Sequence, residues 1–400
     1  MVAIETSQKA AIENVIQSLN MYSFMAICFQ AELEGKDIVP YLNSISGLSR
    51  HKVKAMFNSD HSPKKLEKLR LDFIEGGLKK AREKGLSKDK LSQLQALRQS
   101  PQKDDSVCFQ GLTGIFEKFS SFPIEKTKEF AILADGFLDQ VKSAAKLNEI
   151  SKLNEAIDTF NSAIGSTRSD DDKFDCWVTF SGKLDKIIDS LFFQLLAVFD
   201  VECGLHFCCA FEPRPVFLWC MPRLNPDVLE NGRIRTKRKA KIRPIRRLLE
   251  LCYVLAKYRE NEQWCERLPG PSELSRALSR DAPTISNWFD GTKTLTIREF
   301  YSINNLFFTG GQHLINEENY PNLGCLYLVA KLFDVFWDIK SDATSGGDFI
   351  RLVDDRAYHQ SWQFHRDRLF PNSKGGTLKW PDILTKQLSV PPELLAQAYE

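Results

Sequence analysis

Apolar residues at intervals of three and four constrain the fold of this chain more than any other feature. The pattern runs through 8–98, resumes through 115–119 and 130–157, and returns in 245–258 and 272–308. This spacing gathers the apolar side chains on one face of an α-helix, and a globular protein buries that face in its core. The sequence therefore predicts a mainly α-helical protein.

The central region differs and adds a small mixed α/β element to this prediction. Residues 177–180 (Trp-Val-Thr-Phe) are typical of a strand, whereas 184–198 are typical of a buried helix. Residues 203–221 alternate β-branched, aromatic and cysteine residues with prolines, which favours a short β element.

Polar segments with proline or glycine indicate where the domains meet. Residues 98–107 (RQSPQKDDSV) form a plausible linker, and 341–348 form a loop. A chain of 400 residues has room for two to four domains at roughly 150 residues each. We predict a helical domain at 1–98, a central helical and mixed region at 107–230, a basic arm with further helices at 231–310, and a mostly helical C-terminal region at 311–400.

No apolar run reaches the length of a membrane span, and no basic and apolar leader marks a secretory signal. The most apolar stretch, 191–201, is interrupted by Gln194 and Asp200. Most of the ten cysteines are scattered, and a chain of this size needs no disulfide framework. We therefore expect a cytoplasmic protein with reduced cysteines and no membrane contact.

The formal net charge is only +2, but the charges are unevenly distributed. Nine basic residues and no acidic residue lie between Arg233 and Arg247. Elsewhere 45 basic residues stand against 52 acidic ones, a balance of −7. Such a concentrated positive patch indicates a polyanionic partner. The alternatives are a solvated surface segment and a membrane-surface segment, although Pro244 interrupts the run and its apolar face is thin.

The segment 272–308 predicts two short helices at a sharp angle and a third helix that closes a small core. Ser272 and Asp281 are typical N-caps of the first two helices, and Pro283 is tolerated in a first turn. Gly291 is typical of a helix C-terminus. The apolar faces are Leu274, Ala277 and Leu278 in the first helix, Ile285, Trp288 and Phe289 in the second, and Ile297, Phe300, Tyr301 and Ile303 in the third.

This segment resembles the helix-turn-helix of the Cro/C1-type (XRE-like) DNA-binding proteins, over about 245–308. Leu274, Ile285 and Gly291 keep the family's spacing of a leucine, an isoleucine eleven residues later and a glycine six after that. Ser279 stands where the family has a turn glycine, and Leu295 stands where it usually has proline.

A second match to the same pattern lies at 42–63, within about 22–75. Leu42 and Val53 are eleven residues apart, and Gly47 occupies the turn position. Ser49 can cap the recognition helix, and Pro63 stands where the family usually has proline, whereas Ser59 stands where it has glycine. An ordinary corner between two helices is the alternative interpretation.

The resemblance implies which residues would read DNA, because the family's recognition helix enters the major groove. By position these are Ala282, Pro283 and Asn287 in one copy, and Arg50, His51 and Ala55 in the other. Arg50 suits guanine and Asn287 suits adenine, whereas Ala282 and Pro283 donate no side-chain hydrogen bonds. The later copy should therefore read sequence weakly.

Nearby cations suit phosphate contacts, which position a protein on the duplex without specifying sequence. The DNA-binding residues predicted together are Arg50, His51, Lys54, Arg233, Arg235, Lys237, Arg238, Lys239, Lys241, Arg276, Arg280, Thr284, Asn287 and Lys293.

Two other clusters offer chemistry, and we favour a structural role for each. The cysteines and histidine at 203–209 (C-x2-H-x-C-C) are soft ligands, but adjacent ligands are awkward for zinc. Asp355 and His359 lie four apart and suit a general base, but a solvated helix face explains them equally well. We therefore predict no catalytic residue, metal or cofactor.

These observations predict a multidomain helical protein that binds double-stranded DNA, with regulation of transcription as its leading use. The central region would mediate homo-oligomerisation or bind a protein partner. The alternatives are a nucleic-acid-binding component of a mobile-element or phage-defence system, and an enzyme of unrecognised type.

Overall fold

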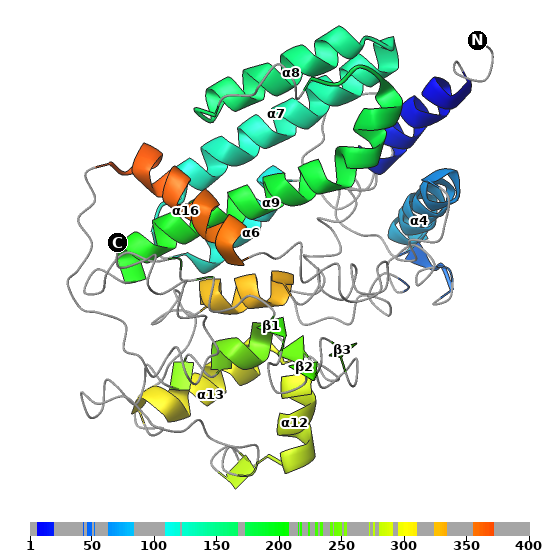
Figure 1. Ribbon diagram of the computed structural model, residues 1–400. Coiled ribbons are helices and arrows are strands. Elements are labelled where there is room, and N and C mark those ends of the chain that lie inside the picture. The colour runs from blue at the N-terminus through cyan, green and yellow to red at the C-terminus, as the bar shows by residue number, and fades with distance from the viewer. Residues whose placement is uncertain are drawn as a thin grey trace. The chain divides into compact units, whose positions relative to one another are not determined.

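The computed structural model describes part of the chain, and everything below concerns that part. The described residues are 6–19, 43, 46–49, 52, 63–83, 109–120, 122–166, 173–207, 215, 217, 223–224, 229–230, 233–234, 241–242, 244–249, 252–253, 272, 275–276, 280–290, 295–309, 324–333 and 355–371. They are mostly α-helical (Figure 1), which confirms the mainly α prediction.

The chain divides into two compact units. The first unit comprises Met1–Ile115 and Glu125–Leu195, and the second comprises Phe116–Ile124 and Leu196–Glu400. None of the described helices is long and apolar enough to cross a membrane. The predicted four-part division and the expected cytoplasmic location stay predictions.

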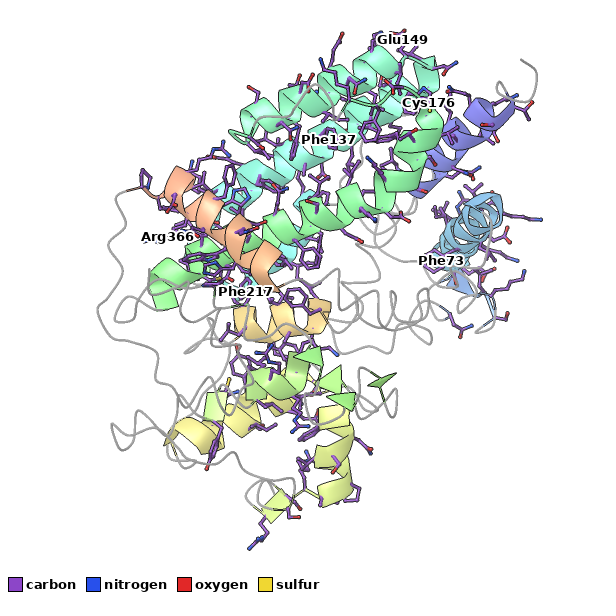
Figure 2. The ribbon with its side chains drawn as sticks, viewed as in Figure 1. Phe73, Phe137, Glu149, Cys176, Phe217 and Arg366 are labelled. Atoms are coloured by element: carbon purple, nitrogen blue, oxygen red, sulfur yellow. The ribbon has the colours of Figure 1, made fainter. Side chains whose placement is uncertain are left out.

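In the first unit, α7 (Glu125–Leu147) and α8 (Ile150–Ala163) form a helical hairpin (Figure 1). Asn148 adopts a left-handed conformation (φ 55°) at the turn, as residues that end helices often do. Phe137, labelled in Figure 2, packs against Phe160 of α8 with ring centroids 5.0 Å apart. The buried apolar residues recur at the helical spacing that the sequence predicts.

The helix α6 (Phe109–Phe119) begins at a carboxylate that comes from α7. The two oxygens of Asp135 accept hydrogen bonds from the backbone N–H groups of Phe109 and Gln110, each at 3.0 Å. A helix N-terminus has unpaired N–H groups and a positive dipole end, so a buried carboxylate is stabilised there. Asp135 therefore fixes the start of α6 although it lies 26 residues away in sequence.

The helix α9 (Trp177–Phe207) corrects the predicted strand at 177–180. Trp177 and Phe180 are both buried, and their rings contact each other edge to face. The burial of side chains three and four apart outweighs the β propensity of Val178 and Thr179, because propensity is only a weak preference. The predicted β element at 203–221 is also wrong at its start, since 203–207 end α9.

In the second unit, residues 196–203 of α9 are all buried. Phe199 stacks on Phe116 at 4.4 Å between ring centroids and contacts Phe217 (Figure 2) at 5.4 Å. The buried carboxylate of Asp200 accepts hydrogen bonds from the backbone N–H of Phe217 and from the hydroxyl of Tyr358, both at 2.9 Å. Tyr358 belongs to α16 (Asp355–Leu369), so Asp200 connects three segments of this unit.

The second unit also contains α12 (Ala282–Asp290), α13 (Ile297–Thr309) and a buried helix at 324–333. Four strands of two residues each form two antiparallel pairs. β1 (Arg223–Leu224) pairs with β4 (Lys241–Ile242), and β2 (Leu229–Glu230) pairs with β3 (Arg233–Ile234). These short strands lie within 223–242, after the stretch in which the sequence predicted a β element.

Candidate nucleic-acid interface

The helix α12 begins where the sequence predicts, at a cap formed by Asp281. Its carboxylate accepts hydrogen bonds from the backbone N–H of Thr284 at 3.1 Å and from the Thr284 hydroxyl at 2.7 Å. Pro283 lies in the first turn, where a missing N–H costs nothing. The predicted N-cap and the predicted start of this helix are therefore confirmed.

The segment before α12 is fixed by Ser275, which the sequence did not single out. The carbonyl of Ser275 accepts a hydrogen bond from the backbone N–H of Arg280 at 3.1 Å, and its hydroxyl donates to the carbonyl of Arg280. Ser275 and Arg276 are helical. Two reciprocal hydrogen bonds thus join the preceding helical turn to the residue that leads into the cap.

The two sides of α12 have different environments. Ile285 and Trp288 are buried, as their spacing predicts. Thr284 and Asn287 are half-buried, and Pro283 is exposed. The buried residues therefore anchor the helix in the second unit, while Asn287 and Thr284 keep part of their surface accessible.

The helix α13 begins at a reciprocal cap of Thr296 and Glu299. Glu299 accepts from the backbone N–H of Thr296 at 2.9 Å, and the Thr296 hydroxyl accepts from the backbone N–H of Glu299 at 3.2 Å. This is the capping box, for which Thr-x-x-Glu is the sequence signature. The predicted third helix at 297–308 is confirmed, and the sequence carried a signal for its cap that the apolar spacing alone did not reveal.

Leu295, just before α13, is held by the helix at 324–333. The buried carbonyl of Leu295 accepts a hydrogen bond from the Tyr327 hydroxyl at 2.7 Å. The ring of Tyr327 packs on Phe300 of α13 with centroids 5.3 Å apart. Leu295 is thus a packed residue at the position where the Cro/C1-type family usually has proline, and it is supported by a residue that lies beyond the helix-turn-helix segment.

Two of the predicted DNA-binding cations, Arg276 and Arg280, precede α12. Arg276 and Arg280 are exposed, and the guanidinium of Arg276 donates to the carbonyl of Ser272 at 3.5 Å. The end of the basic run differs, because Arg247 is only 1% exposed in a helix at 244–249. The interpretation of the whole run 233–247 as one surface patch is therefore corrected at Arg247, which packs inside the second unit.

Arg233 and Lys241 are the two cations of the basic run that lie in described strands. Arg233 pairs with Glu230 across β2 and β3, and Lys241 pairs with Leu224 across β1 and β4. The remaining predicted contacts lie outside the described residues: Arg50, His51, Lys54, Arg235, Lys237, Arg238, Lys239 and Lys293.

The first match to the helix-turn-helix pattern is described only around its turn. Gly47 has a left-handed φ of 74°, and the Ser49 hydroxyl accepts from the backbone N–H of Lys52 at 3.3 Å, as a cap would. The helix α4 (Pro63–Glu83) begins at the predicted proline. A Cβ on Gly76 of α4 would lie 2.0 Å from the carbonyl oxygen of Ser46, so this turn packs directly on the backbone of α4.

The two clusters considered for chemistry contain buried residues. Burial raises the pKa of the Cys203 thiol well above its usual value, and the adjacent Cys325 thiol raises it further. Such a thiol is a poor nucleophile near neutral pH. His359 is buried beside Trp362, with ring centroids 6.2 Å apart. Among the described residues, no group of three or more His, Cys, Asp or Glu side chains is placed to hold a metal ion.

No family model, curated protein or solved structure matches this chain. The resemblance to Cro/C1-type proteins therefore rests on the spacing at 274–291 and 42–63 and on the local geometry described above.

Proposed function

We propose that this chain binds double-stranded DNA through a helix-turn-helix at 272–309, with α12 as the recognition helix. The supporting observation is that buried residues anchor α12 while polar residues of the same helix keep part of their surface accessible. Ile285 and Trp288 are buried, whereas Thr284 and Asn287 keep part of their surface accessible. An α-helix fits the major groove of B-form DNA, and polar side chains on its accessible side can reach base edges there.

The residues of α12 imply a modest sequence preference. Asn287 can form two hydrogen bonds with adenine, whereas the Thr284 hydroxyl donates to Asp281 and can only accept a hydrogen bond from a base. Pro283 is exposed but has no hydrogen-bond donor, so its contribution is limited to apolar contact, such as with a thymine methyl group. Regulation of transcription is the biological use that such a reader favours.

The charges around α12 favour phosphate binding. Arg276 and Arg280 are exposed beside the helix start and supply two cations for phosphates. Asp281 is an opposing charge in the same place, but Thr284 binds both of its oxygens within the cap. The positive end of the α12 dipole also compensates part of the negative charge of Asp281. The balance of these charges supports binding of a polyanion.

Duplex binding by the full chain tests this proposal, with fluorescence anisotropy measured between 50 and 200 mM salt. We expect Arg276→Ala/Arg280→Ala to weaken binding equally on all sequences and to lower the slope of log K against log salt by about 1.8, since each phosphate contact contributes about 0.9. Lys152→Ala is the control, because Lys152 lies on α8 of the first unit and is paired with Glu149. A double variant that binds like the parent would contradict the proposed site.

Base reading by Asn287 is tested separately. We expect Asn287→Ala to relax the preference at one base pair and to cost less than the about 1–3 kcal/mol of a full bidentate contact, because its neighbours on α12 offer little further readout. Selection of bound sequences from a random pool, performed with parent and variant, measures this preference. Identical selected sequences would remove Asn287 from the reading surface.

We propose further that the central region 107–230 joins two copies of the chain, so that two recognition helices meet two half-sites. Ile132 and Leu133 of α7 support this, because they are 56% and 37% exposed. We expect the parent to have the molar mass of a dimer in light scattering and Ile132→Glu/Leu133→Glu that of a monomer. Gln140→Glu on an exposed polar position of α7 is the control. A parent that is monomeric without DNA would favour a different protein partner.

A further inference from the structure

The buried side of α16 differs in composition from that of an ordinary core helix. Its buried side chains, among those that the structure describes, are Tyr358, His359, Trp362 and His365. Each of them carries a polar atom, and none is aliphatic. The more apolar Phe364 of the same helix is 38% exposed. An amphipathic helix in a core usually buries its apolar residues instead, so the arrangement in α16 is partly inverted.

The helix α7 shows the usual arrangement and serves as a reference. Its buried residues include Phe130, Leu138 and Val141. Moving such side chains out of a core exposes apolar surface to water, which is unfavourable. Moving the buried side of α16 into water instead exposes a hydroxyl, an indole and two imidazoles, all of which water can hydrogen-bond. The penalty for undocking is therefore smaller for α16 than for α7.

Two of the buried groups of α16 are solvated better in water than in the folded unit. The indole N–H of Trp362 has no hydrogen-bond partner in the part of the chain that the structure describes. A buried N–H without an acceptor loses the hydrogen bond that it makes in water. Burial, aided by Arg368, lowers the pKa of His365 to about 4, so docking excludes the charged form of this imidazole. Both groups gain hydration when α16 leaves its site.

One strong contact opposes this release. The Tyr358 hydroxyl donates to the buried carboxylate of Asp200 at 2.9 Å and so joins α16 to the end of α9 (Figure 1). Hydrogen bonds to a charged acceptor are about twice as strong as neutral ones. The same Oδ2 atom also accepts from the backbone N–H of Phe217 at 2.9 Å. The bond from Tyr358 can therefore open without leaving Asp200 unpaired.

Other contacts of α16 lie within the helix itself. The guanidinium of Arg366, labelled in Figure 2, lies 5.7 Å from the centroid of the Trp362 ring. The ring of His359 contacts the same indole with centroids 6.2 Å apart. Residues three and four apart on a helix meet in this way. These contacts move with the helix, so they do not resist its release, and they support its helical form in water.

We propose that α16 is a detachable helix, which docks on the end of α9 through Tyr358 and leaves the second unit while that unit stays folded. Its docking covers the carboxylate of Asp200, and its release opens that carboxylate to solvent. The helix is thus a conformational device of the second unit, and this role does not depend on DNA binding.

Native-state hydrogen exchange of the full chain tests the proposal, at increasing urea concentrations below the unfolding transition. The readout is the middle amides of α16, 361–365, because helix ends fray in any case. We expect them to exchange at least about tenfold faster than the amides at 196–203 of α9, since regions that open alone do so more often than the whole unit unfolds. Their exchange should also depend less on urea, because this slope measures the surface that an opening exposes.

The variant Tyr358→Phe isolates the hydrogen bond with Asp200. We expect exchange at 361–365 to become about 10- to 100-fold faster with the same shallow urea dependence, because a hydrogen bond to a charged group is lost and the ring is kept. Gln363→Ala is the matched control, since Gln363 is exposed on the same helix. Its α16 should exchange like that of the parent.

Two results would overturn the proposal. Equal rates and equal urea slopes at α16 and at the end of α9 would show that both open together, and α16 would then be an integral part of the core. Parental exchange in Tyr358→Phe would show that the contact with Asp200 does not hold the helix. Neither result bears on the proposed binding of DNA, which is measured separately.

Discussion

The two segments that match the helix-turn-helix pattern are fixed in different ways. The turn at 46–49 lies in the first unit and packs on α4 through the backbone, with Gly76 against the carbonyl of Ser46. The segment 272–309 lies in the second unit and is held by polar side chains, among them Asp281 and Tyr327. The first should therefore be sensitive to added volume, and the second to the loss of hydrogen bonds.

The largest effect is expected for Gly76→Ala, which tests the packing of the first turn. The new methyl group would lie 2.0 Å from the Ser46 oxygen, so either the turn or α4 must move. We expect the free energy of unfolding to fall by about 3 kcal/mol, at the upper end of the cost of overpacking. Urea unfolding followed by far-ultraviolet circular dichroism measures it.

Gly182→Ala on α9 is the matched control, because no heavy atom lies within 4 Å of its added Cβ. There alanine should gain about 0.5–1 kcal/mol, since glycine is unfavourable inside a helix. If Gly76→Ala were also stabilising, the turn would not pack on α4, and the first segment would lose the contact that distinguishes it from the second.

A pH-dependent effect of similar size is expected in the second unit. Burial, aided by Arg368, lowers the pKa of His365 on α16 from 6.5 to about 4. The folded state therefore binds fewer protons than the unfolded state between these values, and stability falls as the pH drops from about 6.5 towards 4. His365 should account for a loss of about 2–3 kcal/mol between pH 7 and 4.5.

The measurement is urea unfolding of the parent and of His365→Leu at several pH values. The variant is expected to have a different stability at pH 7 because of its changed packing, but a shallower loss towards pH 4.5. An identical pH dependence in parent and variant would mean that His365 titrates normally in the folded protein.

A smaller effect is expected for Tyr327→Phe, which removes one hydrogen bond and keeps the ring on Phe300. The carbonyl of Leu295 would lose its donor in a buried place, which costs about 2 kcal/mol. If this variant also weakens duplex binding, the helix at 324–333 supports the proposed interface. Unchanged stability would show that the carbonyl of Leu295 finds another donor. The hydrogen bond from Tyr327 would then no longer distinguish the segment 272–309 from the turn at 46–49.

What the sequence could predict depended on the range of the interactions. The starts of α12 and α13 were predictable because caps and apolar spacing involve residues three or four apart, as with Asp281 and Thr284. The contact of Tyr327 with Leu295 spans 32 residues, and no local pattern indicates it. The burial of Arg247 was missed for the same reason, because a run of cations is typical of a surface and only the packing of the second unit decides otherwise.

The smallest effect is expected for Asp281→Ala, which separates the cap of α12 from its charge. Removing the side chain leaves the N–H of Thr284 without its acceptor, so stability should fall by about 1 kcal/mol. The same change removes a negative charge beside Arg280, which favours duplex binding, so binding should weaken only if the first turn of α12 unfolds.

Asp281→Asn keeps a capping oxygen without the charge and serves as the matched variant. We expect it to retain most of the stability and to bind duplex DNA more tightly than the parent, because one phosphate-repelling charge is gone. Thermal unfolding and anisotropy on the same samples give both quantities. Asparagine and alanine variants with equal affinities at or below that of the parent would show that this carboxylate does not face DNA, and that α12 is a structural helix like those around the turn at 46–49.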